Sequence, residues 1–394
     1  MPRREALPDD LKELSSLCGA GKLFAVQEWI RIGRRYRLPD GHFTTSPLRI
    51  SIRSGFHSLV EVLLRAGVSQ EEKNEALARA VWDRNLDIVE LLREYGADIT
   101  AIDPEEVLWS RDPAIIRWFI ANGMDLETTE LIATAFRDKQ REFLGIYMDL
   151  RDQIPSARKQ AAMALRYHAE QGNLKWVSLL LWAGADPRLS VPRIEKRDWE
   201  EDEEDQSALK VAIRYGGVEI VKKIGLDPQR DDVTWLLNQY FIPAKPEIIE
   251  FLIKAGADVT AIDSDVVDSV FCSFRWGLET GFMGDPVRTE EALRCMEILG
   301  SHGVRWSGQD KYRLLRLRRT LARIRPSEAI RYLQRITNSK IIEPAVLKEV
   351  MRTPRLQEIL KHPFPGAVEV RRHAGQPVKS RRTRHARVGQ NAMT

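Results

Sequence analysis

Short apolar segments that recur in pairs dominate the hydrophobic pattern of this chain. Segment 59–64, LVEVLL, has the i, i+3, i+4 apolar spacing of one buried helical face. A shorter apolar segment, LRISI, precedes it and follows Ser46 and Pro47, which suit the N-cap and first position of a helix. Gly55 and Gly67 then end the two predicted helices. The pattern predicts two short helices that would be marginal alone and need packing partners.

This helix pair recurs along the chain. Copies are visible as EALARAVWDRNLDIVELLREYGAD at 75–98, MALRYHAEQGNLKWVSLLLWAGAD at 163–186, SALKVAIRYGGVEIV at 207–221 and IIEFLIKAGAD at 248–258. The segment after the second helix also repeats, as GADITAID and GADVTAID. Such repetition predicts a solenoid, in which each pair buries its apolar face against its neighbours.

The repeated unit resembles the ankyrin repeat, whose pattern runs TPLHxAAxxGHxxIVxLLLxxGAD. The copy at 46–67 has Ser46, Pro47 and Leu48 at the TPL positions and Gly55 at the inter-helix turn. The resemblance covers about residues 11–304 and implies an all-α ankyrin-repeat solenoid with short hairpin loops. It also implies a binding protein and not an enzyme, although the fold alone does not name a partner.

The glycines that end successive repeats are Gly33, Gly67, Gly96, Gly123, Gly184, Gly256 and Gly303. Their spacing, with the longer gaps divided, predicts about nine degenerate repeats in an array over residues 1–304. Arg84 and Arg111 stand where the inter-helix glycine is expected. The longer gaps also predict an acidic insertion near 187–206 and a second insertion near 275–291.

The C-terminal part differs in pattern and charge. Residues 305–394 hold 22 Lys and Arg against 6 Asp and Glu, although the whole chain has a net charge of only +4. Residues 305–361 predict basic helices that cap the array. Residues 362–394 have no apolar periodicity and predict a disordered basic tail.

The chain offers no convincing catalytic, cofactor or metal-binding motif. Segment 19–22, GAGK, is followed by Leu23 where a phosphate-binding loop needs Ser or Thr. The seven His and three Cys are scattered, without the short spacings of a metal site. We therefore expect no enzyme activity and no cofactor.

Candidate partner contacts lie at the ends of the first helices. Trp82 is the most suggestive, because Trp, Tyr and Arg are enriched in binding hot spots. The candidates are Arg53, Ser54, Trp82, Asp83, Glu170, Gln171, Arg214 and Tyr215. By contrast, Trp118, Trp176 and Trp182 fall within second helices, so we expect most of the tryptophans to pack in the core or between repeats.

The leading functional hypothesis is a protein-interaction scaffold or adaptor. The alternative is a nucleic-acid-associated protein, whose basic C-terminal region makes non-specific phosphate contacts. The tail residues for such contacts, or for nuclear import in a eukaryote, are Arg371, Arg372, Lys379, Arg381, Arg382, Arg384 and Arg387. A third hypothesis pairs the acidic segment 195–205 with the tail, which would mask a binding face.

The start of the chain has charges of both signs and no apolar segment of a secretory signal. No apolar run is long enough to span a membrane. These features predict an intracellular protein, cytoplasmic or nuclear, without a membrane partner. A closed repeat array needs no second copy, so we expect a monomer.

Overall fold

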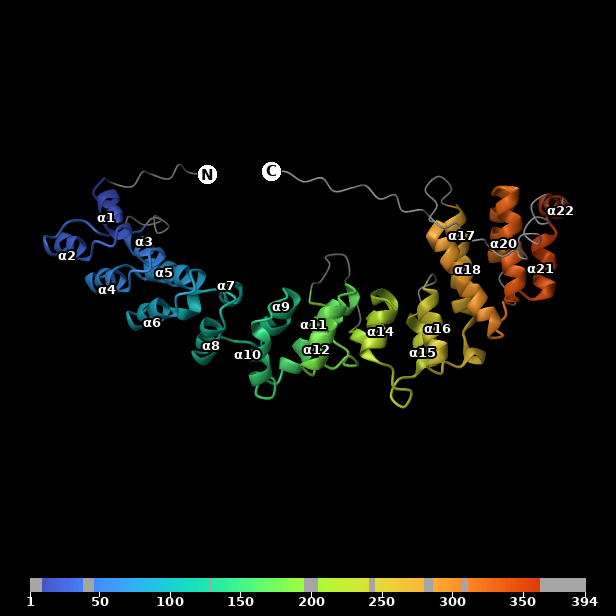
Figure 1. Cartoon of the computed structure of the whole chain (residues 1–394), viewed down its shortest axis with the longest axis horizontal. Helices are drawn as coiled ribbons and strands as arrows, with labels where there is room; N and C mark the ends of the chain where they lie inside the picture. The colour runs from blue at the N-terminus through green and yellow to red at the C-terminus, as the bar shows by residue number, and fades with distance from the viewer. Residues whose placement is uncertain are drawn as a thin grey trace, which may run out of the picture. The chain divides into compact units, whose positions relative to one another are not determined.

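The computed structural model describes residues 9–37, 46–127, 129–194, 205–240, 245–279, 286–306 and 311–361. These residues are all-α, and the β-structure among them is limited to two isolated bridges. Up to Ser301, the described residues form nine successive helix pairs, the repeat pattern predicted from the sequence (Figure 1). The chain divides into two compact units, unit 1 over Met1–Asp232 and unit 2 over Val233–Thr394.

Each pair consists of a first and a second helix. The first helices are α1 (Asp9–Gly19), α3 (Pro47–Arg53), α5 (Gln70–Trp82), α7 (Pro104–Trp109), α9 (Leu131–Arg137), α11 (Ala157–Glu170), α13 (Ala208–Val211), α15 (Val233–Tyr240) and α17 (Ser264–Glu279). The second helices are α2 (Leu23–Arg31), α4 (His57–Ala66), α6 (Leu86–Glu94), α8 (Pro113–Ala121), α10 (Phe143–Leu150), α12 (Leu174–Trp182), α14 (Val218–Ile224), α16 (Pro246–Lys254) and α18 (Pro286–Ser301).

Three shorter helical elements complete the pairs. The segments GADITAID and GADVTAID each hold one turn of 3₁₀ helix, η2 (Ile99–Ala101) and η4 (Val259–Ala261). The side chains of Asp98 and Asp258 cap these turns in the same way. A π-helical turn, η3 (Ala212–Gly216), continues α13.

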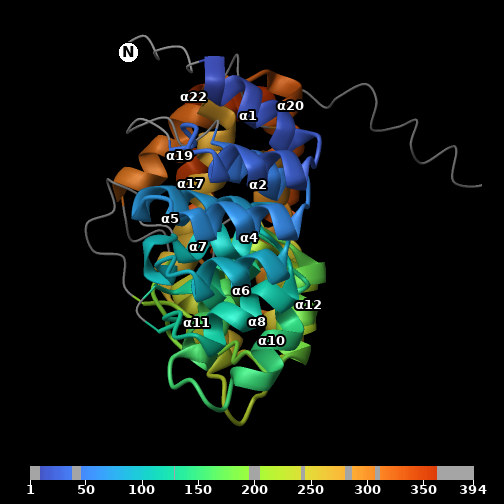
Figure 2. The same ribbon diagram turned by 90° about the vertical axis from the view of Figure 1, so that its left-hand side faces the viewer.

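Unit 1 is held together by contacts between equivalent helices of neighbouring pairs. First helices pack in the order α1, α3, α5, α7, α9, α11 and α13, and second helices pack as α2 on α4, α4 on α6, α8 on α10 and α12 on α14. Figures 1 and 2 both show the first helices of this unit on one side and the second helices on the other. Equivalent positions in neighbouring repeats therefore lie beside each other.

An aromatic cluster joins the fifth and sixth pairs. The Phe136 ring is fully buried and meets Tyr147 edge-on, with ring centroids 5.2 Å apart. The centroid of the Phe143 ring lies 5.9 Å from that of Phe136, and the centroid of Trp176 in the next repeat lies 6.3 Å from it. Such aromatic contacts contribute beyond the burial of area, so this cluster is a main stabilising contact between the two repeats.

His168 makes a second link between these repeats. Its imidazole is fully buried, stacks on Trp176, and has Nε2 2.9 Å from the Phe136 carbonyl oxygen. A carbonyl can only accept, so Nε2 carries the proton and Nδ1 holds the lone pair. Burial lowers the pKa of His168, because the charged form loses its hydration.

The lowered pKa of His168 predicts a loss of stability in acid. As the pH falls through the ordinary pKa of about 6.5, the unfolded chain takes up a proton on this imidazole, whereas the folded chain does so only at a lower pH, so acid favours the unfolded chain. We expect the free energy of unfolding to fall below pH 6.5, by at most about 1.4 kcal/mol per pH unit from this group. Urea unfolding at pH 7.5 and 5 should show a smaller decrease in His168→Gln than in the wild-type chain. An identical decrease in both would contradict the prediction.

Unit 2 joins the last two pairs to four further helices, α19 (Lys311–Arg323), α20 (Pro326–Ser339), α21 (Pro344–Met351) and α22 (Pro354–Lys361). In this unit α18 packs on α16 and α20, and α17 packs on α19. The Trp306 ring stacks on Phe271 at 4.1 Å, and its Nε1 donates to Asp268 at 2.6 Å. Helices α19 and α20 are thus packed directly against the ninth pair, and α21 and α22 pack on α19 and α20.

The predicted insertions differ in character. An antiparallel bridge between Val191 and Gln206 closes the base of the acidic insertion near 187–206. Residues 195–204 of this insertion lie outside the described residues. The extra residues near 275–291 lengthen both helices of the ninth pair, since α17 runs on to Glu279 and α18 begins at Pro286. Residues 362–394 also lie outside the described residues, so the disorder and contacts of the tail stay predictions.

Two of the three tryptophans in second helices are buried or half-buried, and the third is an exception. Trp176 is buried and Trp118 half-buried, whereas Trp182 is 69% exposed. Trp182 is the last residue of α12, and at 100° per residue it points away from the face formed by Trp176, Val177 and Leu180. Membership of a second helix was not sufficient to predict burial.

Candidate functional site

The turn between the two helices of a repeat has one conformation in the first six pairs. One residue of each turn has a positive φ, and its amide donates to the carbonyl three residues earlier at 2.9–3.2 Å. This is the pattern of a Schellman helix end. The turn residues are Gly21, Gly55, Arg84, Arg111, Lys139 and Gly172, with φ between 53° and 72°.

Three consecutive turns place a cation where glycine is favoured. Arg84, Arg111 and Lys139 have φ of 57°, 53° and 60°. A residue with a Cβ is disfavoured in this region by roughly 1–2 kcal/mol. All three side chains are exposed, and none has a hydrogen bond or ion pair within the described ranges. The chain thus maintains three strained backbone positions that present positive charge to solvent.

Two exposed tryptophans lie beside these cations. Trp82 and Trp109 each precede the turn residue by two positions, and their side chains are 65% and 51% exposed. Because α5 packs on α7, these equivalent positions are neighbours. The same position is Arg53 in the second pair, and its side chain is exposed as well. We call Arg53, Trp82, Arg84, Trp109, Arg111 and Lys139 the turn surface.

The acidic side chains near the turn surface already have partners. Arg79 donates from Nε to Oδ2 of Asp83 at 2.7 Å, and Arg137 donates from Nε to Oδ1 of Asp138 at 2.8 Å. Asp112 caps α8 by accepting the Ala114 amide at 2.8 Å. These carboxylates are thus not available to neutralise the three turn cations directly.

The residues predicted from the sequence fall into two groups. Arg53, Trp82, Gln171, Arg214 and Tyr215 are exposed, and the Arg214 guanidinium lies 5.2 Å from the centroid of the Tyr215 ring. Ser54, Asp83 and Glu170 are half-buried.

The insertion base occupies part of the same edge. Arg193 pairs with Glu170, and the buried Arg166 donates to the Val191 carbonyl at 2.6 Å. Glu170 and Asp83 therefore have roles within the chain, in positioning the insertion and the α5 end respectively. The predicted tail residues lie outside the described residues.

Sequence reasoning missed part of the turn surface. Trp109 occupies the same place relative to Arg111 as Trp82 does relative to Arg84, and this spacing is visible in the sequence. Lys139 was harder to find, because the loop after its repeat has lost the glycine that marks the other repeats. Arg84 and Arg111 were noted as departures from the repeat pattern, but not as members of a surface.

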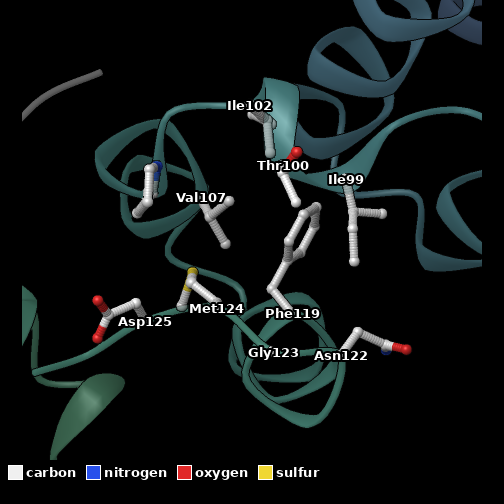
Figure 3. Close-up of a pocket in the computed structure, with 10 residues that line it drawn as sticks. Ile99, Thr100, Ile102, Val107, Phe119, Asn122, Gly123, Met124 and Asp125 are labelled. Carbon is white, nitrogen blue, oxygen red and sulfur yellow. The ribbon is translucent and has the colours of Figure 1, made fainter.

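A small cavity lies at the opposite end of the fourth pair (Figure 3). It has a volume of about 220 Å³ and lies between the start of α7, the 3₁₀ turn and the end of α8. Figure 3 shows the Phe119 ring directed toward Thr100, beside Val107. Ligand sites are usually about 300–1,000 Å³, so this cavity is a gap between hairpin and helix too small to define the function.

No group of three or more His, Cys, Asp and Glu side chains that could hold a metal ion occurs in the parts of the chain that the structure covers. Among the helices described, none is long and apolar enough to cross a membrane.

Comparisons with known proteins agree with the repeat architecture. A family model described as ankyrin repeats in three copies matches residues 15–103. An ankyrin repeat and KH domain-containing protein of Caenorhabditis briggsae is 31% identical over 193 residues, which is 45% of this chain and 7% of that protein. The mask-1 ankyrin repeat and KH domain-containing protein of Caenorhabditis elegans is 29% identical over 236 residues, 54% of this chain and 8% of the relative. The chain thus spans under a tenth of these relatives' length.

Two solved structures are also similar. The human ASB11 ankyrin repeat domain has 17% identity and a TM-score of 0.27, with 55% of this chain and 85% of that chain covered. The ankyrin repeat domain of Bcl-3 has 15% identity and a TM-score of 0.27, with 63% and 87% covered.

Proposed function

We propose that this chain, whose residues 15–103 match a family model of ankyrin repeats, is a scaffold that binds a partner protein through the turn surface. Ankyrin repeats generally mediate protein–protein interaction, and their family and fold are typically non-enzymatic. The observation that carries the proposal is the pair of exposed tryptophans, Trp82 and Trp109, at equivalent positions of neighbouring repeats. We propose that the chain acts by binding this partner and not by catalysis.

The composition of the turn surface suits a binding hot spot. Trp and Arg are the residue types that most often dominate interface energies, and they do so in a central cluster. Trp82 and Trp109 provide large, stiff side chains that lose little conformational entropy on binding. Arg84 and Arg111 add planar guanidinium groups beside them, which recognise carboxylates with two parallel hydrogen bonds.

The remaining exposed candidates extend the proposed surface toward the C-terminal end of unit 1. Arg214 and Tyr215 lie at the end of the first helical segment of the seventh pair, next to Gln171 of the sixth. Their turn is longer than the others, because the π-helical turn inserts a residue before Gly217. We place them at the rim of the surface, where single contacts contribute little.

Loss of both tryptophans is expected to weaken partner binding by about 100-fold, since truncation of one hot-spot residue costs about 1–2 kcal/mol or more. The full chain serves as bait in the native host, and the affinity of each captured protein is then measured by titration. Trp82→Ala/Trp109→Ala is compared with Trp182→Ala, which removes a tryptophan of equal exposure from the end of a second helix. All three side chains are solvent-exposed, so each variant should keep the wild-type circular dichroism spectrum.

The control should bind as the wild type does. Equal affinity of the wild-type chain and the Trp82→Ala/Trp109→Ala variant for every captured protein would contradict the choice of this surface.

A further inference from the structure

We propose that the partner segment held by the turn surface is an acidic polypeptide in the polyproline II conformation, with a carboxylate at every third residue. This inference rests on the proposed function and adds the chemistry and spacing of the partner. It follows from three features of the described residues, namely the spacing of the turn cations, the exposed tryptophans that precede two of them and the strain of their backbone.

The spacing of the cations comes from the packing of the first helices. Helices α5, α7 and α9 pack in succession, and Arg84, Arg111 and Lys139 hold the same place after each. Packed helices lie about 8–10 Å apart, so the positive charges repeat at about that distance. A polyproline II chain has three residues per turn and a rise of about 3.1 Å, which is about 9.3 Å per turn. Every third side chain then lies on one face and meets the next cation.

Other backbone conformations fit this spacing less well. Side chains on one face of a β-strand recur every second residue, at about 6.6–6.8 Å. On an α-helix, the side chains nearest in spacing are seven residues apart, at about 10.5 Å. The repeat of a strand is shorter than the distance of about 8–10 Å between packed helices, and the repeat of a helix is slightly longer.

The tryptophans favour proline between the acids. Proline-rich segments in this conformation dock onto surfaces lined by aromatic rings, and they lose little entropy because they are already extended. Trp82 and Trp109 each come two residues before a turn cation, so an exposed ring accompanies the charge in these two neighbouring repeats. An acidic, proline-containing segment is complementary to both.

The backbone strain indicates that the side chains at these turns are needed. Gly21, Gly55 and Gly172 adopt the same turn in other pairs, so glycine is compatible with the fold at this position. Three consecutive repeats nevertheless carry Arg, Arg and Lys, and strained backbone that persists is concentrated at functional sites. None of the three side chains makes a hydrogen bond or ion pair within the described parts of the chain.

The test measures fluorescence anisotropy of a labelled peptide of five Glu-Pro-Pro triplets with the full-length chain. One control peptide has Gln in place of Glu, and a second has the same composition with all glutamates at one end. The variant Arg84→Gly/Arg111→Gly/Lys139→Gly removes the three charges and relieves the strain, so it should melt no lower than the wild type. The matched control is Arg65→Gln/Arg117→Gln/Lys223→Gln, which removes three exposed charges from second helices.

The Glu-Pro-Pro peptide is expected to bind the wild-type chain and the matched control. The glycine variant should bind the Glu-Pro-Pro peptide about tenfold more weakly or worse, since three charge pairs are lost. The wild-type chain should bind the Gln peptide and the grouped-glutamate peptide more weakly by a similar factor, since the charge pairs are lost or mismatched. Binding should also weaken with salt.

Equal binding of the Glu and Gln peptides, or of the wild type and the glycine variant, would overturn the proposal, as would no binding of the Glu-Pro-Pro peptide at all. Tighter binding of a labelled uridine oligonucleotide, lost in the glycine variant, would assign the surface to single-stranded nucleic acid instead. If the tryptophan variant loses its native partner while the Glu-Pro-Pro peptide fails to bind, the scaffold function stands and only this partner chemistry is wrong.

Discussion

Replacement of Phe136 by alanine is expected to destabilise unit 1 by about 3–5 kcal/mol, the usual cost of removing a fully buried phenylalanine ring. The ring is in contact with Phe143 and Tyr147 of its own repeat and with Trp176 of the next. Its removal leaves a cavity between the fifth and sixth pairs. A repeat array depends on contacts between nearest neighbours. We therefore expect the repeats before the contact between the fifth and sixth pairs to unfold in a different transition from the repeats after it.

Urea unfolding of the full chain, followed by circular dichroism and by tryptophan fluorescence, measures this effect. Phe24→Ala is the control, since its side chain is 82% exposed and its loss should change the free energy of unfolding by less than about 0.5 kcal/mol. A loss of under about 1 kcal/mol in Phe136→Ala would show that the cluster does not hold the two repeats together.

The fold could be predicted because its determinants are local. Ser46 caps α3 through its Oγ, which accepts the Arg49 amide at 3.0 Å, as the sequence indicated. The glycines that end the repeats have positive φ, from Gly33 at 73° to Gly256 at 104°. Glycine spacing therefore reported a backbone requirement directly, and the helix pairs followed from it.

The surface was harder to predict, because it depends on what each side chain meets across repeats. Arg166 is a charged residue in a first helix, yet it is buried and donates to the Val191 carbonyl. Glu170 was a reasonable candidate contact, but Arg193 from the insertion pairs with it. Such pairings join residues more than twenty positions apart, and no local pattern in the sequence encodes them.

Close contacts between distant backbone segments are likewise not encoded in any local sequence pattern. Gly300 lies inside α18, where glycine is ordinarily unfavourable by about 0.5–1 kcal/mol relative to alanine. In the structure, a Cβ at this position would collide with the Ser339 carbonyl, lying 2.9 Å from its carbon and 3.1 Å from the Ile341 nitrogen. Helix propensity alone would therefore mispredict the effect of a substitution here, because α20 ends directly against this residue.

We expect Gly300→Ala to destabilise unit 2 by about 3 kcal/mol, near the upper end of the usual cost of overpacking, because the atoms in the way belong to the backbone and cannot rotate aside. The control is Gly145→Ala in α10, where the nearest atom is the end of the Arg117 side chain at 4.0 Å. That change should leave unit 1 as stable or up to about 1 kcal/mol more stable. Urea unfolding of both variants, followed by circular dichroism, compares the same substitution in two helix interiors. If Gly300→Ala were as stable as the wild type while Gly145→Ala behaved as expected, the close contact between α18 and the end of α20 would be refuted, and with it the direct packing of the C-terminal helices on the ninth repeat.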